Sequence, residues 1–82
     1  MPRVINEPID VYINRSSMLS AFIWRKRIYR VIGVLCWWRE PAEWWNLEPV
    51  RFVFRITARR GVTGIYELAR LGADWFIQRI VD

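Results

Sequence analysis

The sequence has 82 residues, which suits one domain and leaves no room for a second. It has one cysteine, Cys36, and no histidine, so an intrachain disulfide, a cysteine-rich zinc site and catalysis by a histidine base are excluded. Thirteen basic and eight acidic residues give a net charge of +5, hydrophobic residues make up 54% of the chain, and six tryptophans make a bulky core possible despite the short length.

The first half of the chain predicts strands. Apolar residues alternate with polar ones over residues 9–14, which is typical of a strand with one face in water, and residues 20–24 continue in the same style. The basic triplet at residues 25–27 then separates two apolar runs, as the tip of a hairpin does. The second run covers residues 28–38, and Gly33 inside it predicts a bulge or bend. A strand that curls in this way favours a small barrel over a flat sheet.

The middle of the chain combines an irregular segment with a clear strand. Residues 41–49 begin and end with proline and predict a connection in which the first proline can open a single helical turn. The next segment, residues 51–59, has the clearest alternation in the chain. Its even positions are apolar and predict a face in the core, whereas its odd positions place three arginines on the other face: Arg51, Arg55 and Arg59.

The last part of the chain predicts a closing hairpin. A turn at residues 60–61 precedes two apolar segments, 65–71 and 75–81, which flank a second turn that contains glycine. The first of these segments also fits one stripe of a helix that the following glycine would end. For residues 63–71 the sequence is therefore compatible with either a strand or a short helix.

Together these elements predict an all-β fold, with five or six antiparallel strands curled into a small SH3-like or OB-like barrel. The single domain covers residues 1–82, of which residues 1–7 are expected to be partly flexible. The expected core consists of apolar residues from the predicted strands: Ile23, Ile28, Val31, Val34, Phe52, Phe54, Ile56, Leu68, Trp75 and Ile80.

No stretch of the sequence predicts a membrane-spanning or targeting segment. The longest uncharged stretches are residues 16–24 and 31–38, whereas a spanning helix needs about 20 residues. Glu7 and Asp10 stand where a signal peptide would have its apolar run. We therefore expect a cytoplasmic protein with no membrane partner, and the single cysteine is compatible with that location.

Arginine accounts for all but one of the basic residues, the exception being Lys26. Guanidinium groups bind phosphate through paired hydrogen bonds and stack on flat rings, which suits a nucleic-acid surface, although the same arginines can simply solvate the outer faces. In an extended segment Trp37 and Trp38 point to opposite faces, so at least one of them stays outside the core. Such a spare tryptophan can stack a nucleobase, anchor a protein partner or cover the mouth of a small barrel.

The sequence predicts neither an enzyme nor a cofactor. Its acidic residues are scattered, without the spacing of a metal site or of paired catalytic carboxylates. No glycine-rich phosphate loop and no nucleophile with a neighbouring base can be found either.

The order of aromatic and basic residues carries a family resemblance over residues 8–82. The corresponding strings are FIWRKRIYRVIGVL, WWREPAEWW, EPVRFVFRI, IYELAR and DWFIQRIVD. They resemble a small bacterial family of unknown function, whose members are similar to the C-terminal module of ImuB-like proteins, inactive relatives of Y-family translesion DNA polymerases. The resemblance implies an accessory in DNA damage tolerance that contacts DNA or docks on a polymerase-like partner. The family-like hairpin tip usually carries glycine where this chain has Lys26.

Composition and resemblance lead to the hypothesis of a non-catalytic nucleic-acid-binding accessory domain, with single-stranded DNA favoured. The expected site combines basic residues on phosphates with tryptophans under bases: Arg25, Lys26, Arg27, Arg30, Arg51, Arg55, Arg59, Trp38, Trp44 and Trp45. The alternative is a protein-interaction module that docks on a polymerase-like partner or forms a homodimer, with tryptophans as anchors and arginines at the rim.

Overall fold

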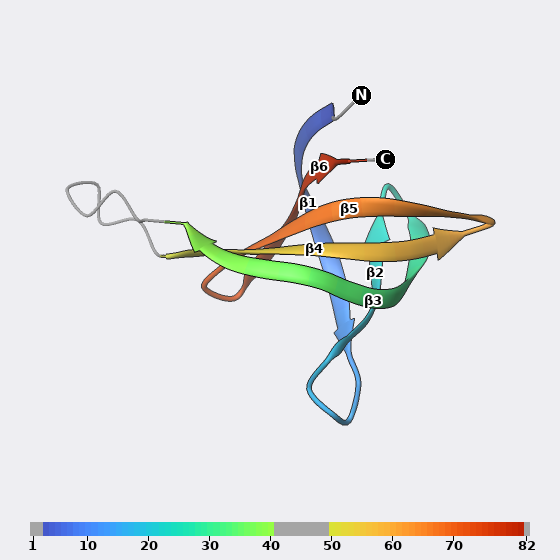
Figure 1. Cartoon of the computed structure of the whole chain (residues 1–82), viewed down its shortest axis with the longest axis horizontal. Helices are drawn as coiled ribbons and strands as arrows, with labels where there is room; N and C mark the ends of the chain where they lie inside the picture. Colours follow the sequence, from blue (N-terminus) through green and yellow to red (C-terminus); the bar gives the residue numbers. More distant parts are fainter. Residues whose placement is uncertain (1–2, 41–49, 82) are drawn as a thin grey trace.

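The computed structural model of the chain describes residues 3–40 and 50–81. These residues form six antiparallel strands and no helix: β1 (Arg3–Ile13), β2 (Leu19–Trp24), β3 (Arg27–Glu40), β4 (Arg51–Arg60), β5 (Val62–Leu71) and β6 (Asp74–Ile80). Each strand pairs with the next one along the chain, and β1 pairs with β6 to close a barrel (Figure 1). The predicted small all-β barrel is confirmed, and the described residues contain no helix long and apolar enough to cross a membrane.

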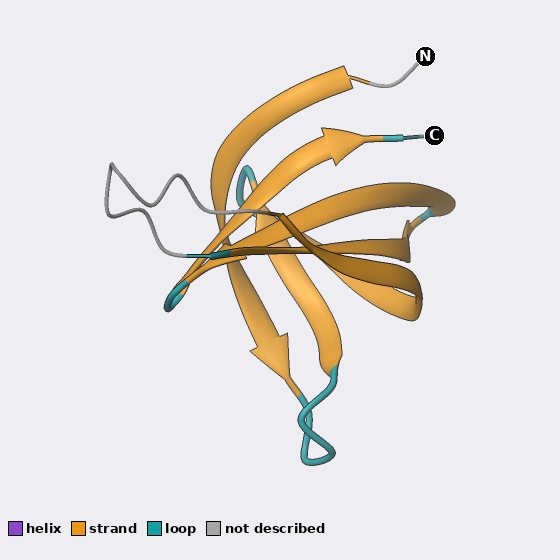
Figure 2. Cartoon of the chain, turned by 60° about the vertical axis from the view of Figure 1, so that its left-hand side comes forward, coloured by secondary structure: helices purple, strands orange, loops and turns teal. Residues whose placement is uncertain are grey.

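The short strand β2 decides the shape of the barrel. It pairs with β3 only up to Ala21 opposite Arg30, whereas β3 continues along β4 as far as Glu40. β1 likewise continues past β2 and pairs with β6 from Arg3 onward. β1 therefore runs beyond one end of β2 and β3 beyond its other end. The barrel is splayed at the end where β3 runs beyond β2, and the loop between β1 and β2 projects away from the other strands (Figure 2).

Two segments whose structure the sequence leaves open are regular strands. Residues 62–71 are β5, so the strand is confirmed and the short helix is wrong, because β5 pairs with β4 along its whole length. Gly61 and Gly72, with φ of 76° and 61°, form the tight turns before and after it. β1 begins at Arg3, inside the segment expected to be partly flexible, because its first residues pair with β6.

The bend predicted at Gly33 is confirmed. The register between β3 and β4 shifts on both sides of the pair Gly33 and Val34, which leaves Ile32 and Leu35 as extra residues without a partner in β4. Two such bulges bend β3 and increase its twist. The bend turns the second half of β3 away from β2 while it stays paired with β4.

The core lies inside the barrel between β2, β4, β5 and β6. Its buried members are Phe22, Trp24, Ile56, Ala58, Leu68 and Ile77, against which Val31, Phe54, Trp75 and Ile80 pack among others. Several of the predicted core residues are thus confirmed. Phe52 is only half-buried and lies beside Trp37 at the splayed end, with 6.5 Å between ring centroids.

The predicted core is wrong for the hairpin of β2 and β3. Phe22 and Trp24 point into the barrel instead of Ile23, and Ile28 is 63% exposed. Both faces of these strands are apolar, so alternation cannot tell which face turns inward. Aromatic packing determines which face turns inward, because Phe22 stacks on Tyr29 inside the barrel with 4.9 Å between centroids.

Val34 is another predicted core residue that the fold leaves partly in water. Its partner Ile56 is fully buried, so Val34 lies on the inward side of β3. It nevertheless remains 39% exposed, because β2 ends before it and no longer covers this part of the barrel.

The tip of the β2–β3 hairpin consists of Arg25 and Lys26, which both have left-handed backbone conformations, with φ of 53° and 64°. Positive φ at both positions is the pattern of a type I′ turn, which favours Asn and Gly. Lys26→Gly should therefore stabilise the fold by about 0.5–1 kcal/mol, because glycine adopts this conformation without strain. Denaturant unfolding measures the change, with Lys26→Ala as a control that keeps the strain. A glycine variant no more stable than the alanine variant would contradict this explanation.

Candidate functional site

The outer side of β3 and β4 carries the predicted row of arginines. Arg51, Arg55 and Arg59 lie four residues apart on one side of β4, as the sequence predicts, and the pairing of the two strands adds Arg30 and Trp38 from β3 on the same side. We call these five side chains the arginine face. Five of the ten predicted site residues are thus brought together by the fold.

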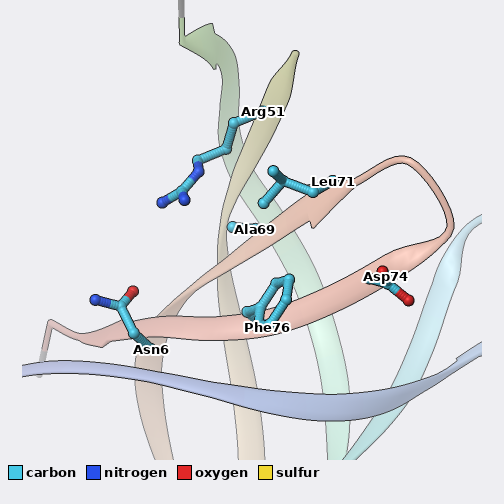
Figure 3. A pocket seen from close by; sticks show the side chains of 6 residues that line it. All are labelled: Asn6, Arg51, Ala69, Leu71, Asp74 and Phe76. Atoms are coloured by element: carbon cyan, nitrogen blue, oxygen red, sulfur yellow. The ribbon is translucent and has the colours of Figure 1, made fainter. Parts of the chain in front are cut away.

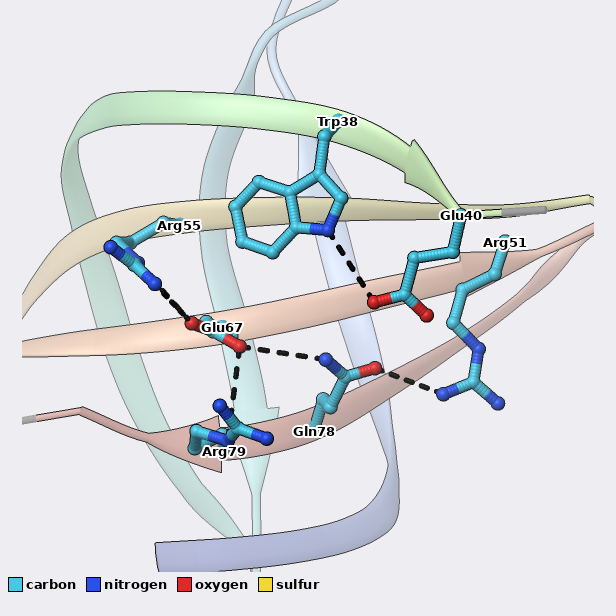
Figure 4. Close-up of polar contacts among 7 residues, drawn as sticks. All are labelled: Trp38, Glu40, Arg51, Arg55, Glu67, Gln78 and Arg79. Atoms are coloured by element: carbon cyan, nitrogen blue, oxygen red, sulfur yellow. Dashed lines mark hydrogen bonds and ion pairs between the residues drawn. The ribbon is translucent and has the colours of Figure 1, made fainter. Parts of the chain in front are cut away.

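A network around a buried carboxylate, Glu67 of β5, holds the arginines at one end of the arginine face (Figure 4). Only 2% of its side chain is exposed, and Arg55 donates to Glu67 Oε2 from Nη2 at 2.7 Å and from Nε at 3.2 Å. Gln78 Nε2 donates to Glu67 Oε1 at 3.4 Å, while Gln78 Oε1 accepts from Arg51 Nη1 at 2.9 Å. Arg79 Nε lies 4.0 Å from Glu67 Oε1. Arg51 and Arg55 are therefore already held by protein groups.

Trp38 lies half-buried beside this network. The guanidinium carbon of Arg55 is 5.5 Å from the centroid of the indole, whose Nε1 donates to Glu40 Oε1 at 3.4 Å. The hydrogen bond to the buried carboxylate raises the pKa of Arg55, so the group above the ring stays cationic. One face of the ring is thus covered, which leaves it poorly placed to stack a base there. The other predicted stacking residues, Trp44 and Trp45, lie outside the described residues.

The other end of the arginine face is a pair of like charges. Arg30 and Arg59 are exposed and stand directly opposite each other in the ladder between β3 and β4. Within residues 3–40 and 50–81, neither of them forms an ion pair. Like charges in this position destabilise a sheet, and an anion bound between them would relieve the repulsion. Arg60 follows Arg59 in β4 but points to the other side of the strand, where its guanidinium lies 6.0 Å from the Tyr29 ring.

The basic tip of the β2–β3 hairpin does not belong to the arginine face. Arg25 is held by Glu7 of β1, with 2.7 Å from Nη2 to Oε2 and 3.0 Å from Nε to Oε1. Lys26 is exposed in the turn. Arg27 lies three residues before Arg30 in the same strand, so the two side chains point to opposite sides of β3. The structure therefore separates these predicted contacts from the rest of the row.

The ion pair at the hairpin tip makes the stability of the fold depend on pH in the acidic range. Glu7 accepts hydrogen bonds from Arg25 and from Trp24 Nε1, which lower the pKa of Glu7 from 4.5 to about 2. A carboxyl group with a lower pKa in the folded state contributes stability that is present above the unfolded pKa and is lost as pH falls through the folded one. The stability lost between about pH 4.5 and pH 2 should therefore be smaller in Glu7→Gln. Urea unfolding across this range measures it, and identical losses in both proteins would contradict the assignment.

Among the tryptophans of the described residues, Trp37 is the one that the barrel leaves largely exposed, and it is not among the site residues predicted from the sequence. It is 61% exposed, and its ring lies 6.4 Å from Phe54, which in turn lies 5.5 Å from Trp75. These rings line a groove of about 330 Å³ at the splayed end of the barrel, with Arg70 beside them. Alternation predicts that one member of the pair Trp37 and Trp38 stays outside the core, but not which one. The choice depends on where β2 ends.

A second pocket, of about 370 Å³, lies on the outer side of the barrel (Figure 3). Ala69, Leu71 and Phe76 supply apolar surface, and the polar groups around them come from three strands: Asn6, Arg51 and Asp74. Because the pocket combines a cation with a carboxylate, its charge does not favour an anionic ligand. In the part of the chain that is described, no group of three or more potential metal ligands occurs.

Comparison with known proteins identifies the family of the chain. No curated protein and no solved structure matches it. A family model described as a domain of unknown function, DUF6504, matches residues 1–82. Nothing in that match links the chain to ImuB-like proteins or translesion polymerases. Because the match covers the whole sequence, the chain belongs to the DUF6504 family.

Proposed function

We propose that this chain is a non-catalytic accessory domain that binds single-stranded nucleic acid, with DNA favoured, through the arginine face. The observation that carries the proposal is the exposed pair Arg30 and Arg59, which stand opposite each other without an ion-pair partner among the described residues. A protein of net charge +5 that holds two guanidinium groups side by side on a rigid sheet is suited to a polyanion.

The phosphate contacts are fewer than the row of arginines suggests. Glu67 and Gln78 hold Arg55 and Arg51, which leaves Arg30 and Arg59 as the available cations at this end. Neutralising about two phosphates of a single strand gives a slope of about −1.4 for the logarithm of affinity against that of salt concentration. Binding of this kind tolerates any base sequence, because phosphates carry no sequence information.

The biological setting belongs to the same proposal. Its support is the resemblance of residues 8–82 to a small bacterial family whose members are similar to the C-terminal module of ImuB-like proteins, which implies a role in DNA damage tolerance. A domain that holds single-stranded DNA near a polymerase-like partner would suit that setting. Binding to DNA is the part that can be measured with the isolated chain.

The test is charge reversal of the exposed pair. Arg30→Glu combined with Arg59→Glu should weaken binding to labelled oligo(dT) at least about tenfold at low salt, because two phosphate contacts become repulsions. Fluorescence anisotropy across a salt series measures both affinity and slope. The double variant keeps a like-charged pair at the same position, so its stability should change little.

A matched control separates local contacts from net charge. Arg3→Glu with Arg15→Glu changes two exposed arginines elsewhere and lowers the net charge from +5 to the same value of +1. This control should bind oligo(dT) more tightly than the double variant. Absence of saturable binding by the unchanged chain at about 50 mM salt would end the proposal, since electrostatic attraction is strong there. Equal binding by the two variants would show that the arginine face is not the site.

A further inference from the structure

One edge of β3 is open over most of its length. The ladder between β2 and β3 ends at Ala21 opposite Arg30, while β3 runs on to Glu40 beside β4. Along residues 31–40, no other strand of the described chain pairs with the edge that faces away from β4. An open edge presents unpaired backbone N–H and C=O groups to which another extended chain can be added.

A continuous cleft runs beside this edge. The groove of about 330 Å³ lies between Met18 and Leu19 on one side and Val34 and Trp37 on the other. A second cavity of about 400 Å³ adjoins it and shares Met18, Leu19 and Val34 with the first. The cleft thus follows β3 from the point at which it leaves β2, where a further strand of a continuous sheet would stand.

The surface around the cleft is apolar and exposed. Met18, Ile32 and Trp37 line it and are each between 56% and 61% exposed, although all three are large apolar side chains. Soluble proteins rarely gather such residues in one patch unless it binds something. The floor is rigid, because Trp75 packs against the barrel core, while methionine adapts its shape to an occupant.

The charge around the cleft selects the occupant. Arg70 lines the groove and Arg30 lines the adjoining cavity, and among the described lining residues there is no carboxylate. A second copy of the chain would bring another +5 charge and the same arginines beside its own edge.

We infer that this cleft binds an extended segment of a partner protein, one that combines apolar side chains with a carboxylate. The segment adds to the open edge of β3 as a further strand and places one apolar side chain between Trp37, Phe54 and Trp75. Its carboxylate pairs with Arg70. This inference does not depend on nucleic-acid binding, although Arg30 of the arginine face also borders the cleft.

The experiment selects the occupant from a random library. Displayed peptides of about a dozen residues are panned against the immobilised full chain, and enriched peptides are measured by anisotropy. They should combine Val, Ile or aromatic residues with Asp or Glu, and Trp37→Ala should lower their affinity at least about tenfold. Val62→Ala, at a 79% exposed apolar residue of β5, is the matched control and should bind normally. Should Trp37→Ala fail to fold, Arg70→Glu replaces it.

Pairing through the backbone has its own readout. Methylation of alternate amide nitrogens in a selected peptide should abolish binding, and the peptide should slow hydrogen exchange of amides in residues 32–38. A library without enriched peptides, or enriched peptides that bind Trp37→Ala or their methylated form equally well, would overturn the inference. Dimers in light scattering that Trp37→Ala abolishes would assign the cleft to a second copy instead.

Binding measurements with the two ligands distinguish the cleft from the arginine face. Arg59→Glu should weaken oligo(dT) binding and leave peptide binding unchanged, and Trp37→Ala should do the reverse. Loss of oligo(dT) binding in Trp37→Ala, with competition between oligo(dT) and peptide, would assign the cleft to nucleic acid and overturn the inference. Failure of the oligo(dT) arm alone would affect only the proposed function.

Discussion

Phe22→Ala is expected to remove a large part of the stability of this domain. The ring is wholly buried, stacks on Tyr29 with 4.9 Å between centroids and meets the edge of Tyr66 at 5.8 Å. Truncation of such a ring costs about 3–5 kcal/mol, because a cavity remains that the barrel cannot fill. A domain of 82 residues has only about 4–12 kcal/mol in total. Denaturant unfolding of both proteins gives the difference.

Ile28→Ala provides the matched control in the neighbouring strand. Its side chain is 63% exposed, so the loss should be no more than about 1 kcal/mol. The sequence alone ranks these residues the other way, because it places Ile28 in the core and does not select Phe22. A loss in Ile28→Ala equal to that in Phe22→Ala would show that the hairpin faces the barrel with its other side.

The difference between these strands explains how much of the fold could be predicted. In β4, even positions are apolar and three odd positions are arginine, so the sequence specifies which face is buried. β2 has the sequence LSAFIW and is apolar on both faces, so residues elsewhere in the chain determine which of its faces turns into the barrel. The bend at Gly33 could be predicted from one residue. The closure of β1 on β6 could not, because it joins the two ends of the sequence.

The candidate site divides in the same way. That the arginines of β4 share a side follows from their spacing, which is local information. The ion pair between Arg55 and Glu67 does not follow from local spacing, because only the register between β4 and β5 places these two residues opposite each other. The exposure of Trp37 depends on the early end of β2, which no pattern in the sequence marks.

Glu67→Gln is expected to weaken the fold and to strengthen nucleic-acid binding. The carboxylate is 2% exposed and accepts hydrogen bonds from Arg55 and Gln78, so loss of its charge should cost about 1–3 kcal/mol. Arg55 is then no longer paired and lies on the same side of the sheet as Arg59, about 13 Å along the strand. With one more phosphate contact, the salt slope should steepen by about 0.7 and affinity at low salt should rise several-fold.

Glu7→Gln is the matched control, because it also raises the net charge from +5 to +6 but frees a cation at the hairpin tip. Unfolding curves and oligo(dT) titrations of both variants separate the two roles of Glu67. Tighter binding in Glu67→Gln alone means that the fold uses a buried carboxylate to withhold Arg55 from the ligand. An equal gain in both variants would reduce the effect to net charge. If Glu67→Gln loses stability without any gain in affinity, Arg55 serves only the barrel, and nucleic-acid contacts are confined to the end of the arginine face at Arg30 and Arg59.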